Sequence, residues 1–223
     1  SRGAMKLRKV FVYYPRGVRT GGPKCLHQLV HVLRTQGLDA YLVPLPGTED
    51  SERVEEYSVY DAPESLSVED APDNLIVVPE TSFVPLTRIR DAHRAVWWLS
   101  ADFAVPLELK KVAQRRAGVF KLARVGVRNF IKGEYAAWQK IKPHLPELIH
   151  LAHSAYARAE VLRHFGLDAQ MLSDYTNPEN EELKRHYLKK RAREPDSVTY
   201  NPRKGGELVE QISRKMPHVK FIP

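Results

Sequence analysis

The sequence predicts an α/β fold in which an open parallel sheet carries helices on both faces. Short β-branched and aromatic runs, such as residues 10–14 and 75–78, lack polar alternation, as is typical of buried parallel strands. Residues 26–33 follow the first run with apolar side chains at helical spacing. This alternation of strands and helices favours crossover connections within a parallel sheet. With 223 residues, the chain is long enough for one or two domains with a substantial core.

The same patterns place the remaining elements along the chain. Further strands are expected at residues 39–44, 94–100, 148–152, 168–172, 197–200 and 218–222. Further helices are expected at residues 155–165, 181–194 and 207–216. Ser154 and Gly166 suit the two ends of the 155–165 helix, because serine caps helix starts and glycine ends helices.

These elements predict two domains. We interpret residues 1–4 as a vector-derived remnant and residues 5–178 as an N-terminal domain. Residues 179–195 are expected to form a linker helix. The 196–223 segment then begins a second strand–helix–strand unit, which cannot bury its own sheet alone. We therefore expect an incomplete second domain.

Composition and charge narrow the functional classes. The net charge of +8 favours anionic partners, although a basic solvated surface is the alternative. A single cysteine excludes an internal disulfide framework and a multi-cysteine zinc site. The nine histidines lack ligand spacing, so no metal site is expected. No apolar run reaches the ~18 residues of a membrane helix. We expect a cytoplasmic protein, peripheral at the inner face of the membrane.

One segment, residues 103–145, carries much of the positive charge on a helical insertion. One interpretation is a solvated helical face that covers the core. The other is a basic amphipathic surface for an anionic lipid or a charged acceptor. The basic residues singled out for this surface are Lys110, Lys111, Arg115, Arg116, Lys121, Arg124 and Arg128.

The first strand leads into a glycine-rich turn and a helix. We expect Gly21 and Gly22 to provide positive φ angles and a close approach to a ligand, with Pro23 in the first helical turn. A helix start of this kind favours an anion. The glycine spacing fits neither a dinucleotide fingerprint nor a phosphate-binding P-loop, in which Cys25 would replace a magnesium-binding hydroxyl. A tight turn without a ligand is the alternative.

Several motifs in order resemble the GT-B glycosyltransferases of the family-4-like bacterial type. The resemblance is carried by Gly21-Gly22-Pro23, Leu26, Leu29, Leu33, Gly37, Asp39-Ala40-Tyr41, Val77-Val78-Pro79-Glu80, residues 97–102, His153-Ser154-Ala155-Tyr156 and residues 200–205. It implies two Rossmann-like domains with a cleft between them, a nucleotide-diphosphate sugar as donor substrate, no further cofactor and no catalytic metal.

The resemblance also implies the donor-phosphate or cleft-facing residues. They are Gly21, Gly22, Lys24, Asn201, Arg203, Lys204 and Gly205. Polar residues at predicted strand ends give the catalytic candidates, because open α/β sheets bind ligands there. Glu80, Asp102 and His153 are these candidates. The alternatives are a helix-start carboxylate for Glu80, a cap for Asp102 and a core histidine for His153.

The sequence therefore predicts a glycosyltransferase of bacterial surface polysaccharide synthesis. It would transfer a sugar from a nucleotide-diphosphate sugar to a glycan or lipid-linked acceptor. We expect little turnover by the 223-residue chain itself, which holds only the start of a donor domain. The rival hypothesis is a non-catalytic basic module for nucleic acid or an anionic membrane. Aromatic residues are few on the basic insertion, so nucleic acid is not the expected partner. A third hypothesis is a small-molecule enzyme on a flavodoxin-like sheet.

Overall fold

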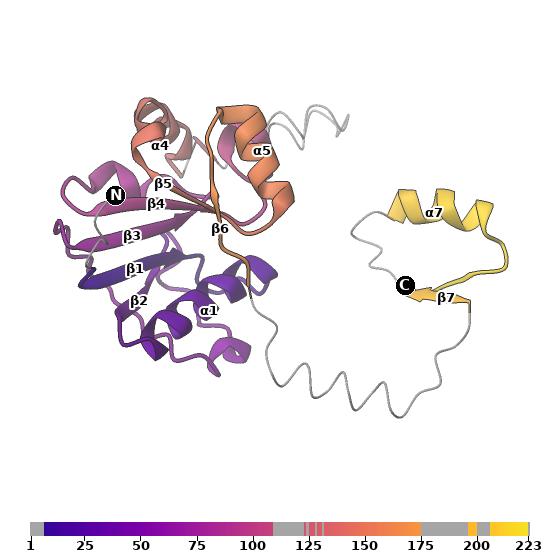
Figure 1. The fold of residues 1–223 in the computed structure, drawn as a ribbon, viewed down its shortest axis with the longest axis horizontal. Helices are drawn as coiled ribbons and strands as arrows, with labels where there is room; N and C mark the ends of the chain where they lie inside the picture. Colours follow the sequence, from indigo (N-terminus) through magenta and orange to yellow (C-terminus); the bar gives the residue numbers. More distant parts are fainter. Residues whose placement is uncertain are drawn as a thin grey trace. The chain divides into compact units, whose positions relative to one another are not determined.

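The computed structural model of the chain describes residues 7–108, 123, 125–127, 129–130, 132–174, 196–199 and 206–222. The chain divides into two compact units, Ser1–Asp174 and Tyr175–Pro223 (Figure 1). The first unit contains a six-stranded sheet flanked by helices. The described part of the second unit contains two strands and a helix. The predicted α/β class, a Rossmann-like open parallel sheet, is confirmed.

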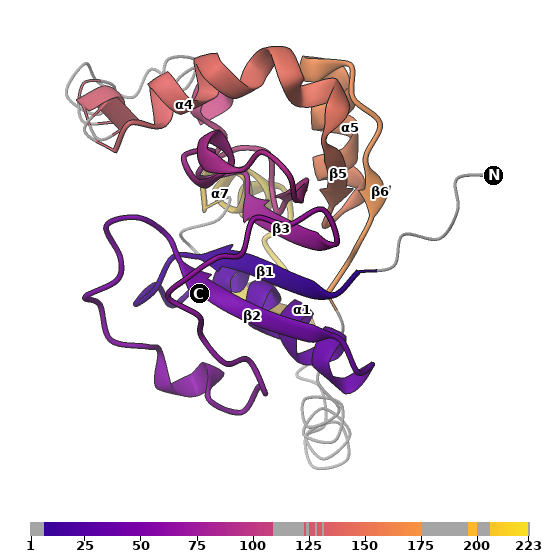
Figure 2. The same ribbon diagram turned by 90° about the vertical axis from the view of Figure 1, so that its left-hand side faces the viewer.

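All neighbouring strands of the first sheet are parallel, in the order β2-β1-β3-β4-β5-β6 (Figure 1). Figure 2 shows β2, β1 and β3 side by side. The strands are β1 (Lys9–Tyr14), β2 (Asp39–Pro44), β3 (Asn74–Pro79), β4 (His93–Trp98), β5 (Ile149–Ala152) and β6 (Gln170–Met171). The carboxyl ends of parallel strands meet at one edge of the sheet. The chain direction across the sheet reverses between β1 and β3, which is where open α/β sheets bind their ligands. The residues that follow these strands are therefore the first place to look for a site.

Helices cover both faces of this sheet. Helix α1 (Gly21–Thr35) packs on the face that carries Val12 and Trp97. The opposite face, which carries Trp98, is covered by the 3-10 helices η2 (Pro85–Arg88) and η3 (Lys142–Glu147) and by the helices α4 (Glu134–Ile141) and α5 (Ala155–Phe165). The tandem tryptophans point to opposite faces because side chains alternate along a strand. Both are at most 2% exposed, so each face has its own packed core.

The predicted helix ends are confirmed where they rest on capping chemistry. The hydroxyl of Ser154 accepts a hydrogen bond from the amide of Ala157 at 3.1 Å, which satisfies one orphan donor of α5. Gly166 ends that helix with φ of 67°, in the left-handed region that favours glycine. Gly37 follows α1 in the same way with φ of 80°.

The expected role of Gly21 and Gly22 in the turn is wrong in one respect. Helix α1 begins at Gly21, and neither glycine has a positive φ. The left-handed residue of the preceding loop is Gly17, with φ of 77°. A Cβ atom on Gly17 would lie 2.7 Å from the Cβ atom of Ser51, so the loop requires a glycine there. The pair at 21 and 22 thus opens the first helical turn and does not shape the loop.

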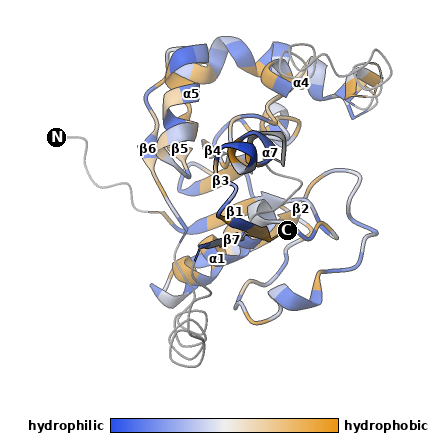
Figure 3. Ribbon diagram, turned by 90° about the vertical axis from the view of Figure 1, so that its right-hand side faces the viewer, coloured by the Kyte–Doolittle hydropathy of each residue, from blue (hydrophilic) through white to orange (hydrophobic). Residues whose placement is uncertain are grey.

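The second unit contains a strand–helix–strand motif in its described part. Strand β7 (Ser197–Thr199) pairs in parallel with β8 (Lys220–Ile222), and helix α7 (Gly206–Lys215) lies between them in sequence. Figure 3 shows apolar positions among the hydrophilic residues of α7. This is the βαβ pattern expected from the sequence.

Much of the predicted basic insertion falls outside the described residues. This holds for Lys110, Lys111, Arg115, Arg116, Lys121, Arg124 and Arg128. Within its described part, Phe103 and Val127 are each 57% exposed and Phe130 is 79% exposed. Among the described residues, no helix combines the length and the apolar character needed to cross a membrane.

Candidate functional site at the carboxyl edge of the sheet

The start of α1 is open at the carboxyl edge of the sheet. A Cβ atom on Gly21 would meet no described atom within 4 Å, and one on Gly22 would lie 3.3 Å from Cδ1 of Leu99, in the loop after β4. Thr20 makes no side-chain cap, and the first turn holds no acidic residue. The first amide N–H groups of a helix lack intrahelical partners and carry partial positive charge. This end of α1 is therefore suited to an anion.

Two buried side chains hold this helix start in place. The hydroxyl of Tyr57, from the 3-10 helix η1 (Glu55–Tyr57), donates to the carbonyl of Thr20 at 2.8 Å. The Nδ1–H of His27 donates to the carbonyl of Pro23 at 2.8 Å. Burial lowers the pKa of His27, so its ring is neutral and keeps a single donor for that bond. Neither residue was a predicted site residue, because the spacing of each resembles that of an ordinary core position.

Lys24 is available to a ligand at the same place. Of the cations between β1 and Cys25, Arg16 pairs with Glu64 at 3.2 Å and Arg19 pairs with Glu56. Lys24 forms no ion pair with any residue that the structure describes. Its ammonium group would add a mobile positive charge to the fixed N–H groups of the first turn.

The candidate Glu80 is fully enclosed after β3. Its side chain accepts hydrogen bonds from the amides of Leu99 at 2.9 Å and Ser100 at 3.0 Å, and from the Ser100 hydroxyl at 3.2 Å. Burial raises the pKa of Glu80 and outweighs these donors, which act to lower it. With 1% exposure, Glu80 holds the loop after β4 in position. This arrangement favours a bracing role over contact with an acceptor.

The candidate Asp102 lies further along the loop after β4. Its Oδ1 accepts a hydrogen bond from the hydroxyl of Tyr156 at 2.9 Å, which connects the loop to the first turn of α5. Asp102 is half-buried, and the Tyr156 side chain is exposed. Asp102 therefore faces solvent at the carboxyl edge more than Glu80 does.

The candidate His153 meets two residues that are distant in sequence. Its Nε2 atom lies 3.7 Å from Sγ of Cys25 and 3.1 Å from Oδ1 of Asp174, which follows β6. Burial raises the pKa of Cys25 to about 11, and Asp174 adds to this rise while Lys24 opposes it. The thiol is therefore protonated at neutral pH and is a poor nucleophile by itself. His153 was a predicted candidate, whereas Asp174 was not, because no pattern in the sequence marks it as a site residue.

The four predicted donor-site residues of the second unit are not part of this geometry. Asn201, Arg203, Lys204 and Gly205 lie outside the residues that the structure describes. Gly21, Gly22, Lys24, Asp102 and His153 remain as the partly exposed members of the predicted set, and all of them follow the carboxyl end of a strand.

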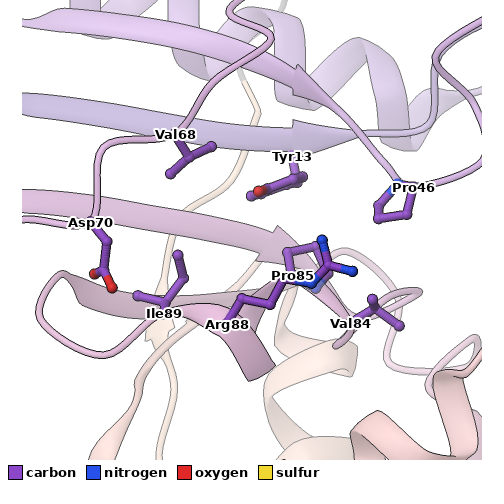
Figure 4. A pocket seen from close by; sticks show the side chains of 8 residues that line it. All are labelled: Tyr13, Pro46, Val68, Asp70, Val84, Pro85, Arg88 and Ile89. Atoms are coloured by element: carbon purple, nitrogen blue, oxygen red, sulfur yellow. The ribbon is translucent and has the colours of Figure 1, made fainter.

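A pocket of about 230 Å³ (Figure 4) lies on the face of the sheet opposite α1. It is lined by Tyr13, Pro46, Val68, Asp70, Val84, Pro85, Arg88 and Ile89. Burial raises the pKa of Tyr13, so its phenol stays neutral. Most of the lining is apolar or proline, which suits an uncharged group better than a diphosphate. No sequence pattern predicts this pocket, because its residues come from four separate segments.

No family model matches the chain, and no curated protein matches it either. The fold and the site together define an α/β protein with an open helix start at the carboxyl edge of a parallel sheet.

Proposed function

We propose that this chain acts in glycosyl transfer with a nucleotide-diphosphate sugar as donor. The observation that carries the proposal is the open start of α1, where Gly21 borders open space and Gly22 packs closely against Leu99 of the loop after β4. A diphosphate is an anion that suits uncapped helix N–H groups. The motif resemblance then narrows the donor to a nucleotide sugar and the acceptor to a glycan or a lipid-linked glycan of a bacterial surface polysaccharide.

The chemistry of sugar transfer explains why such a site is useful. Negative charge develops on the diphosphate as the bond to the sugar breaks, and fixed positive groups stabilise that charge. Lys24 and the first-turn N–H groups of α1 would be the positive groups on this side of the donor. Asp102 is the carboxylate that we place toward the acceptor hydroxyl, because it is half-buried at the same edge of the sheet.

The second unit supports the proposal through its topology. Strands β7 and β8 are parallel with α7 between them in sequence, as at the start of a second Rossmann-like domain. The proposed donor contacts in that unit are Asn201, Arg203, Lys204 and Gly205, in the segment between β7 and α7. No metal or organic cofactor is part of this proposed transfer step.

A second candidate function is favoured by the exposed apolar side chains of the basic insertion. Phe130 is 79% exposed in a segment rich in lysine and arginine. Apolar residues beside basic ones favour an anionic membrane surface. Sedimentation with vesicles of anionic lipid and with vesicles of neutral lipid would test it. Binding to the anionic vesicles alone, reduced by the Phe130→Ser substitution, is expected, and equal binding to both vesicle types would contradict it.

A ligand screen tests the main proposal on the chain as it stands. UDP-, GDP- and TDP-sugars would be compared by saturation-transfer NMR and by calorimetry. We expect one nucleotide class to bind, and the Gly21→Ala substitution to weaken it about tenfold, which is about 1.4 kcal/mol. The added methyl group meets no described atom, and alanine favours a helix over glycine, so folding is preserved.

Matched controls separate the site from general effects. Gly126→Ala also places a methyl group in open space and should leave the affinity unchanged. Lys24→Ala should weaken binding, whereas Lys132→Ala should not. Absence of binding to all three nucleotide classes, or equal affinity in the Gly21→Ala and Gly126→Ala variants, would contradict the proposal.

A further inference from the structure

Three metal-ligating side chains of different chemistry converge at the carboxyl edge of the sheet. The donor atoms of Cys25, His153 and Asp174 all lie within 4.8 Å of one another. They come from the first turns of α1, from the residue after β5 and from the segment after β6. Cys25 and His153 are 128 positions apart in sequence, so only the fold brings them together.

This cluster does not have the geometry of a nucleophilic triad. In a triad, the histidine faces the nucleophile with one ring nitrogen and the carboxylate with the other. Here a single atom, Nε2 of His153, faces both Sγ of Cys25 at 3.7 Å and Oδ1 of Asp174 at 3.1 Å. The ring cannot pass a proton from the thiol to the carboxylate through its two nitrogens. The three donor atoms are instead close enough together to bind one shared ion.

Two of the three donor separations are close to those expected around a tetrahedral zinc ion. Zinc–ligand bonds of about 2.3 Å for sulfur and about 2.0–2.2 Å for nitrogen and oxygen place neighbouring donors roughly 3.3–3.6 Å apart at tetrahedral angles. The observed 3.7 Å and 3.1 Å lie close to this range. A thiolate and a carboxylate together also balance the charge of a divalent cation.

The surrounding contacts hold two of the ligands in place. The amide of His153 donates to the carbonyl of Trp98 at 3.0 Å, and the imidazole packs near the ring of Trp97. The indole N–H of Trp97 donates to the carbonyl of Leu172 at 3.1 Å, which fixes the chain two residues before Asp174. Rigid supports of this kind are what a precise metal site needs.

We propose that Cys25, His153 and Asp174 bind a divalent zinc-type cation through Sγ, Nε2 and a carboxylate oxygen. Three protein ligands leave a fourth tetrahedral position, as in zinc sites that accept water or an external ligand. His153 is 26% and Asp174 48% exposed in their side chains, so this position is accessible from solvent. The proposal does not depend on the transferase activity.

Cobalt titration of the full chain, free of affinity tags and chelators, tests this site. Co²⁺ replaces Zn²⁺ in such sites and gives a thiolate-to-cobalt absorption band together with visible bands of tetrahedral intensity. Because Cys25 is the single cysteine of the chain, a thiolate band reports on this site alone. We expect one equivalent of Co²⁺ to produce both signals, and Zn²⁺ to remove them by displacement.

Variants of each ligand define the outcome. Cys25→Ser should abolish the thiolate band, and His153→Gln and Asp174→Asn should each weaken Co²⁺ binding at least about tenfold, since loss of even an outer-shell partner costs 10–100-fold. His144→Gln is the matched control, because His144 contacts Glu147 at 3.3 Å on the surface without a cysteine. Circular dichroism verifies that each variant is folded.

Two results would overturn the metal site. The first is the absence of a thiolate band at stoichiometric Co²⁺. The second is a band that survives unchanged in His153→Gln and Asp174→Asn, which would reduce the cluster to a thiol beside an ordinary histidine–aspartate pair. Nucleotide-sugar binding is measured separately, so a failure of either proposal is distinguishable from a failure of the other.

Discussion

In each of the two candidate regions of this protein, one carboxylate holds a loop in place. The environments of these two carboxylates shift their pKa values in opposite directions. Glu80, below the carboxyl edge, accepts from the amides of Leu99 and Ser100. Asp70, in the wall of the Tyr13 pocket, accepts from the amides of three successive residues, 90 to 92. Burial raises the pKa of Glu80. Burial also acts to raise that of Asp70, but the three amide donors outweigh it and the pKa is lowered.

The difference shows how one bonding pattern can serve two purposes. At the carboxyl edge, the buried Glu80 fixes the loop that contacts Gly22. This part of the proposed donor site is therefore held rigidly. At the pocket, a more accessible aspartate holds a surface loop with little cost for its charge. The carboxyl edge offers N–H groups, a lysine and metal ligands, whereas the pocket offers mainly apolar and proline side chains.

The largest expected difference between the two regions is the loss of stability when each carboxylate is removed. Glu80→Ala leaves two partly buried amides without their acceptor and removes a fully buried side chain, and we expect a loss of about 3 kcal/mol in the free energy of unfolding. Asp70→Ala leaves the amides of residues 90–92 to bond with water, so the expected loss is about 1 kcal/mol. Urea denaturation of both variants measures the difference. Equal losses would show that burial does not distinguish the two braces.

The pH dependence of stability should have opposite signs at the two carboxylates. Between pH 4.5 and the raised pKa of Glu80, the folded state binds more protons, so its contribution to stability grows as the pH falls. Below pH 3.8, the unfolded state binds more protons at Asp70, so the contribution of Asp70 shrinks as the pH falls.

Isosteric variants isolate these two contributions. The stability gap between wild type and Glu80→Gln should widen on acidification from neutral pH to pH 4.5, by at most about 1.4 kcal/mol per pH unit. The gap between wild type and Asp70→Asn should narrow below pH 3.8. Chemical denaturation at a series of pH values measures both gaps. Slopes of the same sign would contradict the assigned environments.

A smaller effect is expected at the support of the α1 start. Tyr57→Phe removes the hydroxyl that donates to the carbonyl of Thr20 at 2.8 Å and should cost about 1 kcal/mol in stability. It should also weaken nucleotide-sugar binding, because the helix start is less firmly held. Tyr135→Phe, at an exposed tyrosine of α4, is the matched control. Equal binding by both variants would argue against a preorganised helix start.

The smallest expected change concerns the thiol of Cys25. Its pKa of about 11 in the metal-free chain predicts slow alkylation by iodoacetamide at neutral pH. Asp174→Asn removes the negative charge that helps to raise this pKa, so alkylation should become faster at a fixed pH. Asp168→Asn, which lies outside the cluster, should leave the rate unchanged. A fast wild-type rate at neutral pH would contradict a protonated thiol.

Much of the fold could be predicted from local patterns. Buried runs such as residues 10–14 and the helix bounded by Ser154 and Gly166 follow from alternation and capping, which depend on neighbouring residues alone. The positions of Gly21 and Lys24 at the carboxyl edge also follow, since a helix after a parallel strand begins there. The positive φ expected at Gly21 was wrong, because the loop makes its left-handed turn earlier, at Gly17.

Contacts between distant segments could not be predicted in this way. Cys25, His153 and Asp174 have no spacing that marks a site, and only the fold brings the start of α1 close to the residues that follow β5 and β6. The burial of Glu80 depends in the same way on the loop after β4. Packing across the sheet therefore decides which polar residues are supports and which are exposed to a ligand.

An amide chemical-shift map of the isotope-labelled chain, during titration with the nucleotide sugar selected by the screen, shows directly where the donor binds. We expect the amides of Gly21, Gly22 and Lys24 to shift with a common dissociation constant, while those of Arg88 and Ile89 at the Tyr13 pocket do not. Shifts confined to the pocket, with the glycine amides unchanged, would contradict the carboxyl edge as the donor site.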